Sequence, residues 1–101
     1  MKLGKEVKNI GVYNLEDKPN QFIINFSDFD NNVYKVFQSY NSMIIMWKNH
    51  EIIKIGKEWD FSRTTGKYRN VVTGMNKKEF DKMLKNNFTF NESEGVYERK
   101  E

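Results

Sequence analysis

The stretch that decides the fold is SMIIMWKNHEIIKIG, residues 42–56, in which two apolar runs flank the pair Asn49-His50. Short apolar runs of this length are consistent with buried strands. A two-residue connection that begins with Asn is typical of a tight hairpin, because Asn tolerates the left-handed backbone that such turns need. His is less suited than Gly to the second position. The stretch therefore predicts two antiparallel strands joined at Asn49-His50.

Further strands precede this hairpin. QFIINF, residues 21–26, alternates side chains with a period of two, as half-buried strands do. VYKVFQSY, residues 33–40, is rich in β-branched and aromatic residues, which favour strands. DFDNN, residues 28–32, lies between them and has the Asp and Asn residues of a turn. Residues 6–13 predict one more strand, with a weaker pattern.

After the hairpin the apolar spacing becomes that of a helix. Four apolar residues follow the i, i+3, i+4, i+7 spacing of an amphipathic helix: Tyr68, Val71, Val72 and Met75. The side-chain oxygen of Ser62, Thr64 or Thr65 can cap the start of this helix. Gly74 can end it, because glycine readily adopts the left-handed conformation found there. We therefore predict a helix over about 64–74.

A second helix is expected directly after the first. Asn76 and Glu79 have the spacing of a capping box, in which each side chain accepts a backbone N–H of the other residue. The buried stripe of this helix would consist of Phe80, Met83 and Leu84. We predict the helix over about 77–86, followed by a short hairpin made of FTF and VYE.

Strands joined by short turns and followed by segregated helices are typical of an antiparallel α+β domain. We expect one domain over residues 1–101, with an antiparallel sheet of about four to six strands and the two short helices packed on one face. If the helices cover one face only, the apolar residues Ile44, Met46 and Ile53 would suit a homodimer interface, because exposed apolar patches usually mark contacts.

Composition narrows the class of protein. The chain has no cysteine, which excludes disulfides, thiol catalysis and iron–sulfur clusters. It has no alanine but many Asn and Lys residues, a bias that indicates A/T-rich codons and hence a low-GC bacterium or one of its phages. The first residues lack the apolar run of a signal peptide, and no stretch is apolar enough for a membrane span. We expect a cytoplasmic protein without a membrane association.

The segment TTGKY, residues 64–68, resembles part of a phosphate-binding loop. That loop needs a glycine five positions before Gly66 and a Ser or Thr after Lys67, and Phe61 and Tyr68 occupy these places. A helix that begins here could still attract an anion through its free N–H groups, helped by the side chains of Arg63 and Lys67.

Other catalytic and metal-binding patterns are incomplete. Asp28 and Asp30 resemble the start of a calcium loop, but the glycine and the terminal glutamate of that loop are missing, and turn chemistry explains the segment better. His50 is the one histidine, so no pair of histidines can hold a metal. We therefore expect neither an enzyme nor a protein that needs a metal or another cofactor.

The charge is unevenly distributed. Residues 61–86 carry seven basic residues against two acidic ones, and this raises the expectation of a polyanionic or acidic partner, although a solvated helix face also explains it. We expect Tyr68 to point inward and Arg63, Lys67 and Arg69 to point outward. The candidate residues for binding a partner or a nucleic acid are Trp59, Arg63, Lys67, Tyr68, Arg69, Lys77, Lys78 and Lys82.

Two segments resemble a family of small phage and prophage proteins. SYNS, residues 39–42, is similar to the S-Y-N-S/T opening of that family, and WDFSRTTGKY, residues 59–68, is similar to its W-D-Y/F-S-x-T-T-G-K-Y segment. Phe61 stands where the family usually has Tyr. The resemblance covers about a third of the chain, and it implies a phage origin without implying an activity.

Small phage proteins of this kind often bind and block a host machine, including defence nucleases such as CRISPR effectors. We therefore expect a non-enzymatic interaction protein that acts in an infected or lysogenic bacterial host, with a host protein or ribonucleoprotein as its partner. The alternative is an accessory protein that binds single-stranded nucleic acid, because aromatic and basic residues together can stack on bases and follow phosphates.

Overall fold

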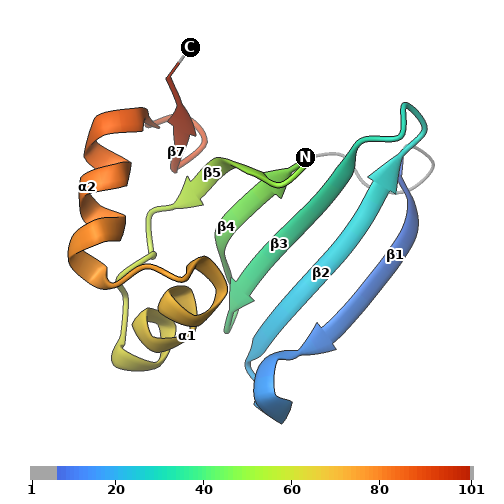
Figure 1. Ribbon diagram of the computed structural model, residues 1–101, viewed down its shortest axis with the longest axis horizontal. Helices are drawn as coiled ribbons and strands as arrows, with labels where there is room; N and C mark the ends of the chain where they lie inside the picture. Colours follow the sequence, from blue (N-terminus) through green and yellow to red (C-terminus); the bar gives the residue numbers. More distant parts are fainter. Residues whose placement is uncertain (1–6, 101) are drawn as a thin grey trace.

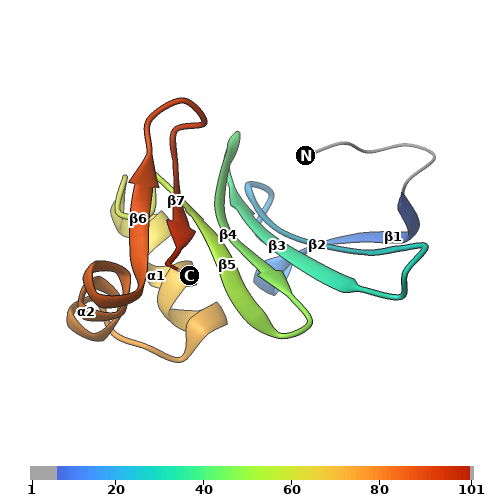
Figure 2. The same ribbon diagram turned by 90° about the horizontal axis from the view of Figure 1, so that it is seen from above.

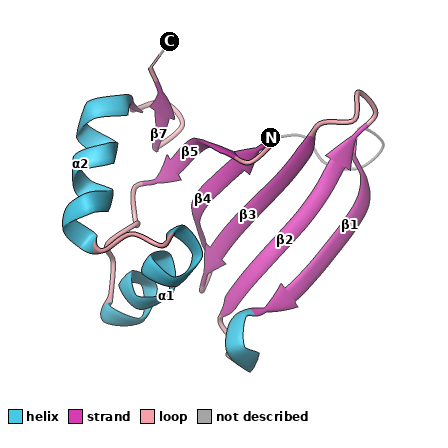
Figure 3. Cartoon of the chain, viewed as in Figure 1, coloured by secondary structure: helices cyan, strands magenta, loops and turns pink. Residues whose placement is uncertain are grey.

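The computed structural model of the chain describes residues 7–100, which form one layer of strands with two helices beside it (Figures 1 and 3). The elements in chain order are β1 (Val7–Asn14), a 3₁₀ turn η1 (Leu15–Asp17), β2 (Gln21–Asp28), β3 (Val33–Ser39), β4 (Ser42–Lys48), β5 (Glu51–Gly56), α1 (Arg63–Thr73), α2 (Lys77–Asn87), β6 (Phe88–Asn91) and β7 (Val96–Arg99).

All the strands described belong to one antiparallel sheet of seven strands, in the order β1-β2-β3-β4-β5-β7-β6. The expected α+β class is broadly correct, but the prediction of four to six strands is wrong. The C-terminal hairpin joins the main sheet because β7 pairs with β5. β1 also joins it, and a bulge at Asn9 and Ile10 obscures its alternation in the sequence.

The hairpin predicted at residues 42–56 is confirmed by the pairing of β4 with β5. Asn49 and His50 both have positive φ, 50° and 72°, as the turns that favour tight hairpins require. The Asn49 side chain also fixes the neighbouring turn, because its Oδ1 accepts a hydrogen bond of 2.9 Å from the backbone N–H of Val33. His50 is thus a residue of the turn itself.

Both helices begin and end close to the predicted residues. The side chain of Ser62 caps α1 by accepting the N–H of Thr65, and Gly74 follows the helix in the left-handed conformation with φ 73°. In α2 the capping box of Asn76 and Glu79 is complete. No helix within residues 7–100 has the length and apolar character that a membrane crossing needs.

The larger apolar core lies between the helices and one face of the sheet. Figure 2 shows both helices at the end of the sheet formed by β5, β7 and β6. Buried residues of this core come from five strands of the sheet, β2 to β6, and from both helices. They are Ile23, Phe37, Ile44, Ile45, Trp47, Ile55, Tyr68, Phe80, Leu84 and Phe88.

A smaller cluster lies on the opposite face of the sheet, where Phe26, Val36 and Met46 are buried. The expectation that Ile44, Met46 and Ile53 form an open dimer face is wrong for Ile44 and Met46, because both are buried within this chain, while Ile53 is half-buried against the smaller cluster. Ile44 packs on the helix side because it is the extra residue of a bulge: Phe37 pairs with Ile45 and Gln38 pairs with Met43. Whether the chain forms a homodimer stays a prediction.

Candidate functional site

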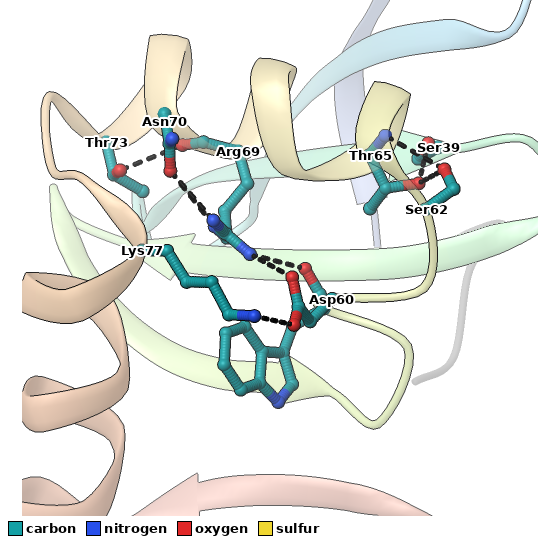
Figure 4. A network of polar contacts seen from close by, with 9 residues as sticks. Ser39, Asp60, Ser62, Thr65, Arg69, Asn70, Thr73 and Lys77 are labelled. Carbon is teal, nitrogen blue, oxygen red and sulfur yellow. Dashed lines mark hydrogen bonds and ion pairs between the residues drawn. The ribbon is translucent and has the colours of Figure 1, made fainter.

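Residues 59–70 comprise the loop before α1 and most of α1 itself. The side chain of Arg69 is the centre of the polar contacts in this segment (Figure 4). The guanidinium of Arg69 donates to the backbone carbonyl of Trp59 at 3.1 Å, to Oδ1 of Asp60 at 3.2 Å and to Oδ1 of Asn70 at 2.9 Å. It also lies 5.2 Å from the ring centroids of Trp59 and Phe80, the two aromatic rings that enclose it.

Arg69 is 1% exposed, so the expectation that it points outward is wrong. Three residues of α1 are buried, namely Thr65, Tyr68 and Arg69, and they lie three and four positions apart, as residues on one helix face do. A buried cation is tolerated when its donors are paired, and this one has carbonyl, carboxylate and amide acceptors. Arg69 is therefore a structural residue that fixes the loop before α1.

Asp60 joins the two helices. Its carboxylate accepts from Arg69 of α1 and forms an ion pair of 2.8 Å with Lys77, the first residue of α2. The hydrogen bond from Lys77 lowers the pKa of Asp60, burial opposes this, and the hydrogen bond from Arg69 lowers it further, so the pKa lies below its usual value. Asp60 therefore remains ionised at neutral pH.

The two segments that carry the phage resemblance meet at the start of α1. The hydroxyl groups of Ser39 and Thr65 lie 2.8 Å apart in a buried hydrogen bond (Figure 4). Ser42 donates to Oε2 of Glu58 at 3.3 Å, one residue before Trp59. Residues 39–42 and 59–68 thus form one structural unit, although the sequence separates them.

A shallow depression lies over the start of α1 and encloses about 690 Å³. The Phe61 ring is 69% exposed there. We call this region the Phe61 surface, defined by Asp60, Phe61, Arg63, Lys67, Asn70 and Lys77. The side chains of Arg63 and Lys67 are exposed, so the depression that Phe61 lines also carries cations.

The residues proposed from the sequence divide into three groups. Arg63, Lys67 and Lys77 come together on the Phe61 surface. The second group packs against the interior: Tyr68 is buried, as expected, Arg69 is buried as well, and Trp59 is half-buried with its ring 5.2 Å from that of Phe80. The third group is exposed on α2 and does not line this depression: Lys78 and Lys82.

Phe61 itself is missing from the residues proposed from the sequence. A hydrophobic ring next to a helix start is usually assigned to the core, and nothing in the sequence separates Phe61 from the buried Tyr68 except its place outside the helical stripe. Asp60 is missing for a similar reason, because its partners Arg69 and Lys77 lie nine and seventeen positions away.

Comparison with known proteins gives one match. A family of unknown function, DUF8033, matches residues 6–95. No curated protein and no solved structure matches the chain significantly.

Proposed function

The chain belongs to the DUF8033 family, whose function is unknown, and we propose that it is a phage-encoded, non-enzymatic interaction protein that binds an acidic surface of a host protein through the Phe61 surface. The proposal rests chiefly on one observation: an exposed phenylalanine ring lines the same depression as the exposed cations Arg63, Lys67 and Lys77. Aromatic residues and arginine are enriched among the residues that carry the binding energy of protein interfaces.

The charges favour an acidic partner. Among the residues that line the Phe61 surface, Asp60 is the one acid, and Arg69 and Lys77 both engage it. The side chains of Arg63 and Lys67 stay exposed and cationic. Complementary charge at the rim of an interface speeds encounter and selects the partner, while a central aromatic anchor supplies affinity.

The electrostatic state of Asp60 agrees with the non-enzymatic part of the proposal. A general base works best when its pKa lies near the pH of the reaction. The pKa of the Asp60 carboxyl is lowered by Lys77 and Arg69, which makes it a weaker base than an ordinary aspartate. The arrangement suits a fixed structural charge better than a proton acceptor.

Phage origin and the blocking of a host machine are inferred from the resemblance of residues 39–42 and 59–68 to small phage proteins. A buried hydrogen bond between Ser39 and Thr65 joins these two segments in the fold. A defence nuclease of the CRISPR type is one kind of host machine that such a protein would block.

Binding of single-stranded nucleic acid is the alternative function. Such proteins stack bases on exposed aromatic rings and follow the phosphates with Lys and Arg. Phe61 and the cations Arg63 and Lys67 fit this scheme, but Trp59 and Tyr68 are packed against the core and offer no open ring. A single exposed ring in the segment favours a protein partner.

A pull-down from a lysate of a low-GC bacterium tests the proposal. The parent protein should retain one host protein after nuclease treatment, and Phe61→Ser should lose it. The matched control is Phe29→Ser, the same change at another exposed phenylalanine. Equal retention by Phe61→Ser and the parent would refute the proposed surface, and loss of the partner after nuclease treatment would favour the nucleic-acid alternative.

A further inference from the structure

A second pocket lies beside the Phe61 surface and shares Lys67 with it. It encloses about 330 Å³, and it lies between the loop that leads into β2, the turn between β3 and β4, and the first turns of α1. Lys67 lines both depressions. The size lies within the range of pockets that hold small molecules.

Two buried polar residues belong to the lining of this pocket. Gln21 is 1% exposed and Tyr68 is 2% exposed, and the remaining lining residues are exposed. Within residues 7–100, neither the amide nitrogen nor the amide oxygen of Gln21 has a hydrogen-bond partner, and neither has the hydroxyl of Tyr68. Buried polar groups in folded proteins nearly always have partners, so these three atoms are candidates for hydrogen bonds to a ligand.

The rim of the pocket is cationic. Lys18 and Lys67 are exposed there, and none of the residues that line the pocket is acidic. Thr64 lies in the first turn of α1, where free backbone N–H groups favour anions. A ligand of this pocket should therefore carry a negative charge at the end near the two lysines.

The other lining groups favour a ligand with a flat, hydrogen-bonding ring. The amide of Gln21 presents a donor and an acceptor side by side, which is the pattern that pairs with the N6 and N7 edge of adenine. The ring of Tyr40 is exposed at the rim, where a base can stack on it. A charged end, a hydrogen-bonding edge and a flat face together describe a nucleotide.

We propose that this pocket binds a nucleoside monophosphate, with its phosphate at Lys18 and Lys67 and its base edge at Gln21 and Tyr68. The amide of Gln21 and the hydroxyl of Tyr68 are closed off from solvent in the free protein, so this placement of the base requires the Gln21 side chain to turn toward the pocket. Lys67 is shared by the two sites, but Phe61 and Arg63 do not line this pocket, so Phe61→Ser and Gln21→Met test the two sites separately.

Calorimetric titration with adenosine monophosphate tests the site, with adenosine and inorganic phosphate as separate probes. The nucleotide should bind at a single saturable site, and each of the two fragments should bind at least about tenfold more weakly, because each keeps only part of the contacts. Absence of saturable binding by the nucleotide would overturn the proposal. Inorganic phosphate that binds as tightly as the nucleotide would overturn it as well.

Variants then assign the residues. Gln21→Met and Lys18→Met should each weaken nucleotide binding by about tenfold or more, whereas Lys78→Met, an exposed lysine outside the pocket, should leave it unchanged. Unchanged binding by both Gln21→Met and Lys18→Met would refute the placement.

A thermal unfolding scan of the free protein separates a ligand site from a structural role. Gln21→Met and Tyr68→Phe remove the buried polar atoms that lack partners, so neither should lower the midpoint of unfolding. If both variants unfold at clearly lower temperature than the parent, these atoms stabilise the free protein and the ligand site is refuted. Tyr68→Phe also keeps the binding test available if Gln21→Met does not fold.

Discussion

Replacing Arg69 by alanine removes the group that ties the loop before α1 to the helix. The parent side chain donates to Trp59, Asp60 and Asn70 and lies between two aromatic rings. The replacement leaves the carbonyl of Trp59 and the amide oxygen of Asn70 without this donor. It also opens a cavity beside the ring of Phe80, because only the Cβ atom remains.

The expected loss of stability in Arg69→Ala is large because the guanidinium is buried and paired. Two buried methylene groups contribute about 1.6 kcal/mol at about 0.8 kcal/mol each. Breaking a buried charge pair by removing one partner costs about 3–5 kcal/mol in total. Asp60 is partly exposed and keeps its ion pair with Lys77, so the lower end applies. We expect Arg69→Ala to lower the free energy of unfolding by about 3 kcal/mol, out of about 5–15 kcal/mol for a typical domain.

Urea unfolding followed by tryptophan fluorescence measures this loss, because Trp59 lies against the Arg69 side chain. Arg63→Ala is the matched control: it changes the same residue type at an exposed position of the same helix, and it should cost no more than about 0.5 kcal/mol. Arg69→Met keeps most of the apolar stem, so its loss in the free energy of unfolding should lie between those of Arg69→Ala and Arg63→Ala. If Arg69→Ala and Arg63→Ala lose equal stability, the reasoning about the buried guanidinium is refuted.

Three further outcomes follow from the structure. The pKa of Asp60 is lowered in the folded state, so the stabilisation that its carboxylate gives is present above about pH 4 and is lost as the pH falls through the folded pKa. In acid titrations the free energy of unfolding of Asp60→Asn should therefore fall less between pH 5 and pH 2 than that of the parent, and equal falls would contradict this. Gly56→Ala would place its Cβ 2.0 Å from the carbonyl oxygen of Met43, so it should cost about 2–3 kcal/mol in urea unfolding, whereas a neutral result would mean that β4 can move away. His50→Gly should raise the free energy of unfolding by about 0.5–1 kcal/mol, since φ at this position is 72°, and a loss of stability would reveal a role for the imidazole.

Local patterns in the sequence predicted most of the elements of the fold. The hairpin at Asn49-His50, the cap at Ser62 and the capping box at Asn76 depend on residues within a few positions of one another, and all are present. The number of strands in the sheet was predicted wrongly, because the pairing of β7 with β5 joins segments about forty positions apart. The packing of Ile44 was missed because a bulge reverses the face that simple alternation assigns to it.

The candidate site was only partly predictable, because many of its contacts join residues that are far apart in the sequence. The basic residues Arg63, Lys67 and Lys77 were found from charge alone, and the structure places them together. Burial of Arg69 depends on acceptors from the preceding loop and on a ring from α2, which no local pattern reveals. The pocket at Gln21 depends on segments from residues 18–21, 40 and 64–68, so no motif could have indicated it.

Photo-crosslinking from position 61 tests the central claim most directly. A photoreactive phenylalanine analogue placed at Phe61, in protein produced inside the bacterial host, should yield one crosslinked host protein that resists nuclease digestion. The same analogue at Phe29, which is 66% exposed on the turn between β2 and β3, serves as the control and should not yield that product. The account is contradicted if position 61 gives no product in the host, or if both positions give the same one.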